Sequence, residues 1–436
     1  MKLTAAPQLS IGLPVYNGEN FLHEALISIL AQDFVEFELV ICDNASTDRT
    51  EAICRDFCRR DRRVRYFRNP ENIGASGNWN RVFELSKGEF FKWIAHDDLH
   101  EHDFLSRTLE ILTSEPDVVV AFTRAVSIDS RGRRIREWAT HPDICSLDLK
   151  TRYARWLAAA EDPLPLPIFG VMRADVLRKT RGFMAYPEAD IALLTELSLY
   201  GRFAEVPEPL FLQREHRARA GPKLARNPYE AVKFWDPQKG RHLYFPHWSL
   251  LAGYLFALAK APLSMRQRRG CLRLVAKWAN RKRGVLFKDV TMAASRMPVI
   301  GAPLRRLHER CLLRAWYRKV DRAARDLETL IPRSTTYLLV DDATFGSRVV
   351  SGRHARPFLE GPDGYAGPPL DDETAVRELE RMRQEGAAYL AIAWPCFWWL
   401  TYYRGFIDYL NHSFPRILEN DRLIVFELRT NASCST

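Results

Sequence analysis

The first hundred residues alternate between two patterns of apolar and polar positions. Short, almost continuous apolar runs predict buried strands at 9–17, where the strand ends in a loop, and at 37–42, 64–67 and 90–94. Between them, apolar residues recur every three or four positions and predict amphipathic helices at 19–32, 50–60 and 79–86. Strand and helix therefore alternate along the chain. This alternation predicts a Rossmann-like α/β domain, with a mostly parallel sheet and helices on both faces.

The rest of the chain changes pattern twice. The pattern of residues 227–330 predicts a series of helices, whereas that of the last hundred residues again predicts alternating strands and helices. Strands are predicted there at 337–340, 389–394 and 423–428, and helices at 371–384 and 398–410. We therefore expect three parts: an α/β domain at 1–225, a basic helical segment at 226–330, and a small α/β domain of unassigned role at 331–436.

Positive charge is concentrated in the central helical part. The 436-residue chain has a net charge of +10, but residues 239–330 alone hold 21 Lys/Arg against 5 Asp/Glu. Such a block indicates an anionic partner, either a membrane surface or nucleic acid, and ordinary solvated helix faces are an equal alternative. The block lacks the interleaved aromatic residues of a nucleic-acid stacking surface, so nucleic acid is the weaker option.

The most apolar window, 243–259, is interrupted by Pro246, His247 and Ser249. It falls short of the run of about 20 residues that spans a bilayer, which leaves a packed or an interfacial helix. The eight cysteines include no Cys-x-x-Cys pair, and the first eight residues show no secretory signal. We expect a cytoplasmic protein, either free or peripheral on the inner face of the membrane.

Polar groups follow three of the predicted strands at the point where each strand ends. They are Asn17, Asp43 and the adjacent pair Asp97 and Asp98. The carboxyl ends of parallel strands meet at one rim of a sheet, where ligands bind. Two adjacent carboxylates there can hold a hard divalent cation against a phosphate. Solvated loop residues or a helix N-cap are the alternative for the pair.

Five motifs in order resemble the family 2 glycosyltransferases, which have the GT-A fold. The resemblance covers about residues 8–220, half of the chain, and its motifs are Leu-Pro-Val-Tyr-Asn at 13–17, Asp-Asn-Ala-Ser-Thr-Asp at 43–48, Asn-Ile-Gly at 72–74 with Asn80, Lys-Gly-Glu at 87–89, and Asp97–Asp98. The C-terminal domain carries no motif that we recognise.

The resemblance implies a site for a nucleotide diphosphate sugar. Pro14, Tyr16 and Asn17 would border the base, and the Asp43 carboxylate would accept a hydrogen bond from it. An Asx turn with Ser46 is the structural alternative for Asp43, and both roles are compatible. The remaining nucleotide-binding candidates are Asn80, Arg81 and His96.

The resemblance also implies a Mg²⁺ or Mn²⁺ ion that bridges the diphosphate. Asp97, Asp98 and His216 are the candidate ligands, with His216 in an Arg-x-His motif on a closing loop. The family usually has Asp-x-Asp-Asp at this place, whereas this chain has Ala95 at the first position. The carboxylate that normally contacts the ribose is therefore missing, while the metal ligand is retained.

A candidate general base follows from the same resemblance. Asp190 aligns with the family's base, and Glu188 is its substitute. The base would take the proton from an acceptor hydroxyl as that oxygen attacks the sugar. The alternative for Asp190 is a cap of the helix that begins at Ile191.

Taken together, these residues predict an inverting, metal-dependent glycosyltransferase of the hexosyltransferase type. We expect it to move a sugar from a nucleotide diphosphate donor, UDP- or dTDP-linked, to a hydroxyl on a glycan or lipid-linked acceptor in polysaccharide or glycolipid assembly. The second hypothesis is a catalytically decayed binding or scaffold protein whose basic segment binds membrane or RNA.

Overall fold

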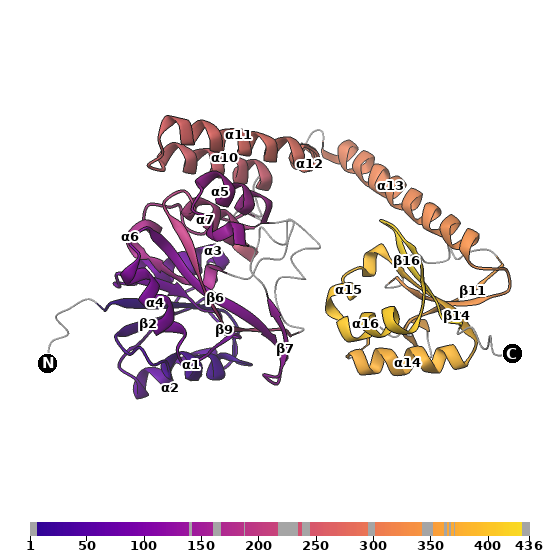
Figure 1. The fold of residues 1–436 in the computed structure, drawn as a ribbon, viewed down its shortest axis with the longest axis horizontal. Helices are drawn as coiled ribbons and strands as arrows, with labels where there is room; N and C mark the ends of the chain where they lie inside the picture. Colours follow the sequence, from indigo (N-terminus) through magenta and orange to yellow (C-terminus); the bar gives the residue numbers. More distant parts are fainter. Residues whose placement is uncertain are drawn as a thin grey trace. The chain divides into compact units, whose positions relative to one another are not determined.

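The computed structural model describes residues 7–138, 142–159, 167–186, 188–216, 234–237, 245–294, 301–341, 352–361, 364–365, 368–369 and 371–429 (Figure 1). Their contacts divide the chain into two compact units, Met1–Gly301 and Ala302–Thr436. Helices α10 to α12 of the predicted basic segment therefore group with the first unit.

The first unit is built on a nine-stranded sheet in the order β3-β2-β1-β4-β8-β6-β9-β5, with β7 paired to β6. Its first four strands are parallel and alternate with three helices, as the apolar pattern predicts. These elements are β1 (Leu9–Val15), α1 (Leu22–Leu30), β2 (Phe37–Asp43), α2 (Thr50–Arg60), β3 (Val64–Arg68), α3 (Gly74–Glu84) and β4 (Phe90–Trp93). The α/β fold expected for this part of the chain is confirmed.

The second half of the sheet is mixed. Strand β9 (Arg202–Arg214) runs parallel to β6 (Val118–Ile128), while β8 (Val171–Arg173), β7 (Arg134–Trp138) and the short β5 (Leu99–His100) pair antiparallel with their neighbours. The helices of this half are α4 (Phe104–Ser114), α5 (Leu149–Ala158), α6 (Ala174–Leu177) and α7 (Ala189–Leu197). Because β5 pairs with the far end of β9, residues after Trp93 lie beside residues after Arg214.

Alternate side chains of the strands feed two hydrophobic cores, one on each face of the sheet. In β4, Phe90 joins the core beneath α1, α2 and α4, whereas Phe91 and Trp93 join the core beneath α3, α5 and α7. Figure 1 shows these helices on the two sides of the sheet. Burial on both faces explains why the strands are continuous apolar runs.

Three further helices, α10 (Pro246–Lys260), α11 (Met265–Arg281) and α12 (Arg283–Ala294), follow the sheet. Leu250, Tyr254 and Trp278 from α10 and α11 belong to the same core as α5 and α7. The described part of the apolar window at 243–259, from Pro246 onward, is therefore a packed helix. No helix in the described parts of the chain is long and apolar enough to cross a membrane.

The second unit is a small α/β fold with a five-stranded sheet in the order β11-β10-β14-β16-β15. Its strands are β10 (Thr336–Val340), β11 (His354–Pro357), β14 (Ala387–Ala393), β15 (Arg416–Glu419) and β16 (Leu423–Glu427). Helix α13 (Gly301–Leu330) packs Val320, Ala323 and Leu327 on one face, and α14 (Asp372–Gln384), α15 (Trp399–Tyr402) and α16 (Arg404–Ser413) cover the other. The predicted small C-terminal α/β domain is confirmed.

Candidate functional site

The loops after β1 and β2 are joined by hydrogen bonds at the rim of the sheet. The two strands end side by side, because Val15 pairs with Asp43. The Asn17 amide donates to Ser46 Oγ at 2.9 Å, and Asn17 Oδ1 accepts from the Thr47 amide at 2.8 Å. Asn17 holds a left-handed conformation, with φ of 51°, which asparagine tolerates better than most residues. Beside it, the Tyr16 ring is 48% exposed.

Asp43 is completely buried under this rim. Its Oδ1 accepts from the Ser46 amide at 2.8 Å, and its Oδ2 accepts from Tyr66 and from Arg68, each at 2.7 Å. The Asx-type turn at Ser46 is therefore present. Both carboxylate oxygens have donors from the protein, so Asp43 shapes the loop, and its contact with a base stays a prediction.

His96 brings the loop after β4 to the same rim. A Cβ added to Gly18 would come within 2.8 Å of His96 Cδ2, so the imidazole lies directly against the loop after β1. Burial lowers the pKa of His96, partly offset by the charge of Asp97. The loops after three strands thus converge, as the positions of Asn17, Asp43 and Asp97 in the sequence predict.

Asp97 and His216 meet next to this loop. His216 Nε2 lies 2.9 Å from Asp97 Oδ2, and the His216 ring packs on Phe21 with centroids 4.8 Å apart. Burial is the largest single influence and acts to raise the pKa of Asp97, but the hydrogen bond from His216 and the charges of His96 and His216 together outweigh it, so the pKa is lowered. The sequence places these two residues 119 positions apart, and the antiparallel pairing of β5 with β9 brings them together.

Asp98, the second acid of the pair, points toward the protein interior. It is buried, and its Oδ1 accepts a 2.8 Å hydrogen bond from the Arg214 amide. The pair thus divides into one carboxylate beside His216 and one that anchors the end of β9. A role for Asp98 as a metal ligand stays a prediction.

Arg214 contacts several of the loops that form the site, although its place in the sequence indicated no separate role. Its completely buried guanidinium donates to the carbonyl of Asp97 at 2.9 Å and to Glu24 of α1 at 2.7 Å. It also donates to the carbonyls of Asp129 and Ser130 in the turn after β6. The Arg-x-His motif was the available signal for this residue.

The donor set at Asp97 and His216 fits Mg²⁺ or Mn²⁺. A carboxylate and an imidazole from two chain segments suit a cation that completes its shell with phosphate oxygens and water. Within the described residues, no group of three or more His, Cys, Asp or Glu could hold a metal by itself. Ions of this kind bound through substrate phosphates commonly have only one or two protein ligands.

Asn80 and Arg81 have partners away from this rim. The Asn80 side chain makes two hydrogen bonds to the backbone of Phe183, at 2.8 and 2.9 Å. Arg81 faces Cys42, whose pKa burial raises to about 11 against the opposing charge of Arg81. Asn80 thus ties α3 to the loop that leads to α7, and nucleotide contacts by the two residues stay predictions.

Four asparagines fix the loop before α3, a feature the sequence analysis missed. Asn44 Oδ1 accepts from Asn69 Nδ2 and from the Ile73 amide, while Asn44 Nδ2 donates to Asn72 Oδ1 at 2.9 Å. Asn69 also donates to Asn78, which in turn donates to the carbonyl of Cys42. The Asn-Ile-Gly motif was recognised, but its partner Asn44 lies in the loop after β2.

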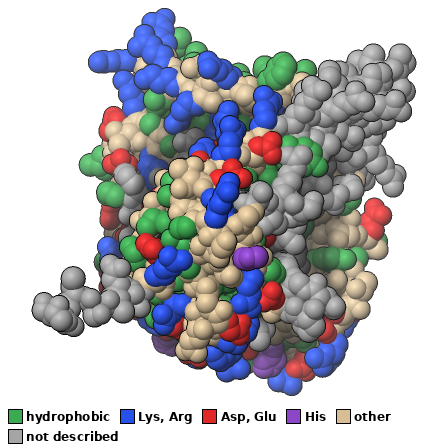
Figure 2. Space-filling model, turned by 90° about the vertical axis from the view of Figure 1, so that its right-hand side faces the viewer, with side chains coloured by type: hydrophobic (Ala, Val, Ile, Leu, Met, Phe, Trp, Pro, Cys, Tyr) green, Lys and Arg blue, Asp and Glu red, His purple; other side chains and the backbone are tan. Residues whose placement is uncertain are grey.

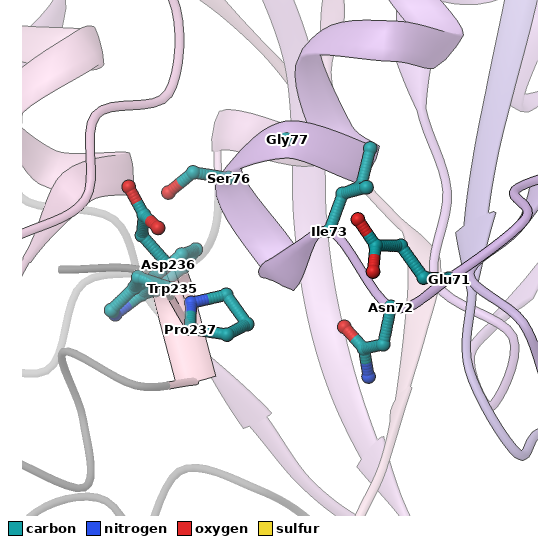
Figure 3. A pocket seen from close by; sticks show the side chains of 8 residues that line it. All are labelled: Glu71, Asn72, Ile73, Ser76, Gly77, Trp235, Asp236 and Pro237. Atoms are coloured by element: carbon teal, nitrogen blue, oxygen red, sulfur yellow. The ribbon is translucent and has the colours of Figure 1, made fainter. Parts of the chain in front are cut away.

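A cavity of about 440 Å³ lies at the start of α3 (Figure 3). It is lined by Glu71, Asn72, Ile73, Ser76, Gly77, Trp235, Asp236 and Pro237. Figure 3 shows the Ser76 hydroxyl pointing toward Asp236. Ser76 is 6% exposed, and its Oγ has no hydrogen-bond partner. The cavity therefore offers an unused hydroxyl beside an aromatic ring and carboxylates.

Glu188 and Asp190 lie at the start of α7, in the second half of the first unit. The resemblance implies that the acceptor binds there, and we call it the acceptor half. Glu188 is the N-cap residue, in a left-handed conformation with φ of 60°, and Asp190 lies in the first turn. Burial raises the pKa of Asp190, against a hydrogen bond from the Ile191 amide. A raised pKa is typical of a carboxylate placed to accept a proton, and the base assignment stays a prediction.

Residues 10–178 match the family model described as glycosyl transferase family 2. The chain is 35% identical over 119 residues to an uncharacterized glycosyltransferase of Rickettsia typhi, covering 27% of this chain and 36% of that protein. It is 29% identical over 143 residues to an uncharacterized glycosyltransferase of Haemophilus influenzae, covering 33% of this chain and 57% of that protein. The chain thus spans from about a third to somewhat over half of these relatives.

Among solved structures, S. aureus TarS 1-349 in complex with UDP-GlcNAc superposes with a TM-score of 0.47 at 17% identity, covering 66% of this chain and 80% of that one. The similarity to glycosyl transferase family 2 thus lies in the N-terminal part of the chain, residues 10–178, which holds the motifs described above.

Proposed function

We propose that the protein transfers a sugar from a nucleotide diphosphate sugar to an acceptor hydroxyl. The observation that carries the proposal is the convergence of three strand ends, with Asp97 and His216 in contact at 2.9 Å beside the loop after β1. Such a rim can hold a diphosphate through a bound cation while the attached base lies against the exposed ring of Tyr16.

Asp97 and His216 would hold the Mg²⁺ or Mn²⁺ ion, and Arg214 keeps the Asp97 loop in place from beneath. When bound, the cation supplies charge neutralisation for the leaving diphosphate. Asp190 would accept the proton of the acceptor hydroxyl as its oxygen attacks the anomeric carbon. A single base with direct displacement gives inversion at that carbon.

The cavity at the start of α3 supports recognition of a sugar ring. The Ser76 hydroxyl and the Asn72 amide provide hydrogen-bonding groups, and Trp235 provides an aromatic wall. Replacing Ser76 with Ala removes the hydroxyl and adds no atom to the cavity wall. We expect Ser76→Ala to raise KM for one of the two substrates more than it lowers kcat, and unchanged kinetics would exclude this role.

A screen of nucleotide sugars by thermal shift, with Mn²⁺ or Mg²⁺ present, tests the proposed donor class. A donor that binds the folded state raises Tm with its concentration, and release of free nucleotide diphosphate then reports turnover. Binding without turnover of any donor and acceptor would favour the scaffold hypothesis. No shift with any nucleotide sugar, under conditions in which the protein is folded, would contradict the proposal.

A further inference from the structure

Helices α10 to α12 carry an unusually one-sided charge. Residues 246–294 contain ten Lys/Arg and a single acidic residue, Asp289. Asp289 is buried, and its carboxylate accepts from the His247 amide at 2.6 Å and lies 2.9 Å from His247 Nδ1. Among the described residues of these three helices, no carboxylate is therefore left on the surface to neutralise the basic side chains.

Large apolar side chains are exposed among these basic residues. Met265 is 64% exposed, Leu272 48% and Phe287 69%. On α11, Met265 and Leu272 lie outside the side that buries Cys271, Val275 and Trp278 in the core. Three arginines of α11 are exposed as well: Arg266, Arg269 and Arg273. Helical spacing puts them on the outward side of the helix, next to Met265 and Leu272.

We call the outward side of α11 and α12 the basic–apolar face, defined by Met265, Arg266, Arg269, Leu272, Arg273, Lys277, Phe287 and Lys288. Figure 2 shows Lys and Arg side chains gathered at the upper end of the molecule, with hydrophobic side chains between them. Figure 1 shows α10 and α11 at this same upper end.

We propose that the basic–apolar face docks on an anionic lipid bilayer. Apolar side chains enter the boundary between headgroups and acyl chains, while Lys and Arg stay at the level of the anionic headgroups. A lipid surface therefore satisfies both kinds of exposed residue at once. Nucleic acid would pair with the basic residues but gains little from exposed Met265 and Leu272. Among the residues that define the face, Phe287 is the one aromatic ring, whereas a stacking surface uses a series of them.

The face is firmly attached to the acceptor half of the first unit. Helix α10 packs on α7, and a Cβ added to Gly253 of α10 would collide with Arg181, next to the loop before α7. Docking would thus fix the orientation of α7 relative to the bilayer. If the proposed function holds, this arrangement suits an acceptor held in the membrane; the docking itself does not depend on that function.

Flotation of the full-length protein with vesicles tests the docking. We expect binding to vesicles of phosphatidylglycerol and phosphatidylcholine, weaker binding at high salt, and little binding to pure phosphatidylcholine. Combined charge reversal, Arg266→Glu with Arg269→Glu and Arg273→Glu, should weaken binding by roughly a hundredfold, because each basic residue near the surface contributes separately. Met265→Ser with Leu272→Ser should weaken binding at all salt concentrations.

The matched control reverses three exposed arginines at the end of α2, Arg59, Arg60 and Arg62, which gives the same change in net charge. It should bind vesicles like the unchanged protein. The proposal would be overturned if both triple variants lost vesicle binding equally, or if the unchanged protein did not bind anionic vesicles. Tighter binding to RNA than to vesicles at the same salt concentration would also overturn it. Thermal unfolding verifies that each variant is folded. Donor turnover in solution should persist in the α11 variant, which separates this proposal from the proposed function.

Discussion

At the scale of single residues, Arg214 connects more parts of the site than any other side chain described above. It contacts the loop of Asp97, helix α1 and the turn after β6, yet it is completely buried. Arg214→Lys keeps the charge but cannot reproduce this fork of donors. We expect donor turnover to fall at least about tenfold, together with a loss of about 2 kcal/mol in stability, since buried acceptors lose their partners.

Arg202→Lys is the control, because Arg202 lies at the opposite end of the same strand and forms surface ion pairs with Glu115 and Asp117. Turnover should be unchanged in this variant. Equal activity of the two variants would mean that Arg214 does not position the Asp97 loop.

The raised pKa of Asp190 predicts a particular pH dependence. Burial raises this pKa, so the carboxyl stays protonated to a higher pH than an ordinary Asp. A base works only when deprotonated; kcat/KM should therefore fall as the pH drops through the raised pKa. The pH profile should lose this acidic limb in Asp190→Asn, along with most of the activity. An unchanged profile in the variant would exclude Asp190 as the base.

Lys92 predicts a pH dependence of stability. Burial lowers the pKa of its amine well below 10.5, while the amine donates to the Phe169 carbonyl. Between the lowered pKa and 10.5 the unfolded chain binds more protons at this residue, so its contribution to stability rises with pH. Lys92→Met should remove this rise. Urea titrations from pH 7 to pH 9 measure the free energy of unfolding of both proteins. The same pH dependence of this free energy in both would contradict the prediction.

At the scale of elements, the sequence predicted what is local and missed what is long-range. Strands β1 to β4 and helices α1 and α2 follow from periodicity, because each is long enough and buried on a regular face. Helix α3 was also predicted, but it begins at Gly74, five residues before the expected start, because its first turn has no apolar period. The two-residue strand β5 gives no such signal, yet its pairing with β9 brings His216 to Asp97. The contacts of Asn44 and Asp98 could not be predicted either, since their partners lie 25 to 116 residues away in the sequence.

Gly74 tests the loop at the start of α3. It has φ of +80°, and an added Cβ would lie 2.5 Å from the Trp235 carbonyl oxygen. Gly74→Ala should destabilise the protein by at least about 1–3 kcal/mol and distort the cavity beneath Trp235. Gly284→Ala is the control, because an added Cβ there meets nothing within 4 Å. Denaturant unfolding measures the stability of the two variants. Equal stabilities would show that the loop at Gly74 adjusts freely to an added Cβ.

At the scale of the whole molecule, the described candidate site residues and the basic–apolar face all belong to the first compact unit. The composition of the sequence predicted the basic block. Its helices pack on the α/β domain because Leu250 and Tyr254 of α10 join the same hydrophobic core as α7. The periodicity of the sequence does not reveal this packing. The second unit has its own cores and, among its described residues, no group suited to hold a metal.

The most direct test of the account is nucleotide diphosphate release by Asp97→Asn. With Mn²⁺ and a donor found in the binding screen, the unchanged protein should release nucleotide diphosphate. The rate of release by the variant should be lower by at least about a hundredfold. Asp175→Asn, on an exposed carboxylate paired with Lys179, should retain full activity. Equal release by Asp97→Asn and the unchanged protein would contradict the account.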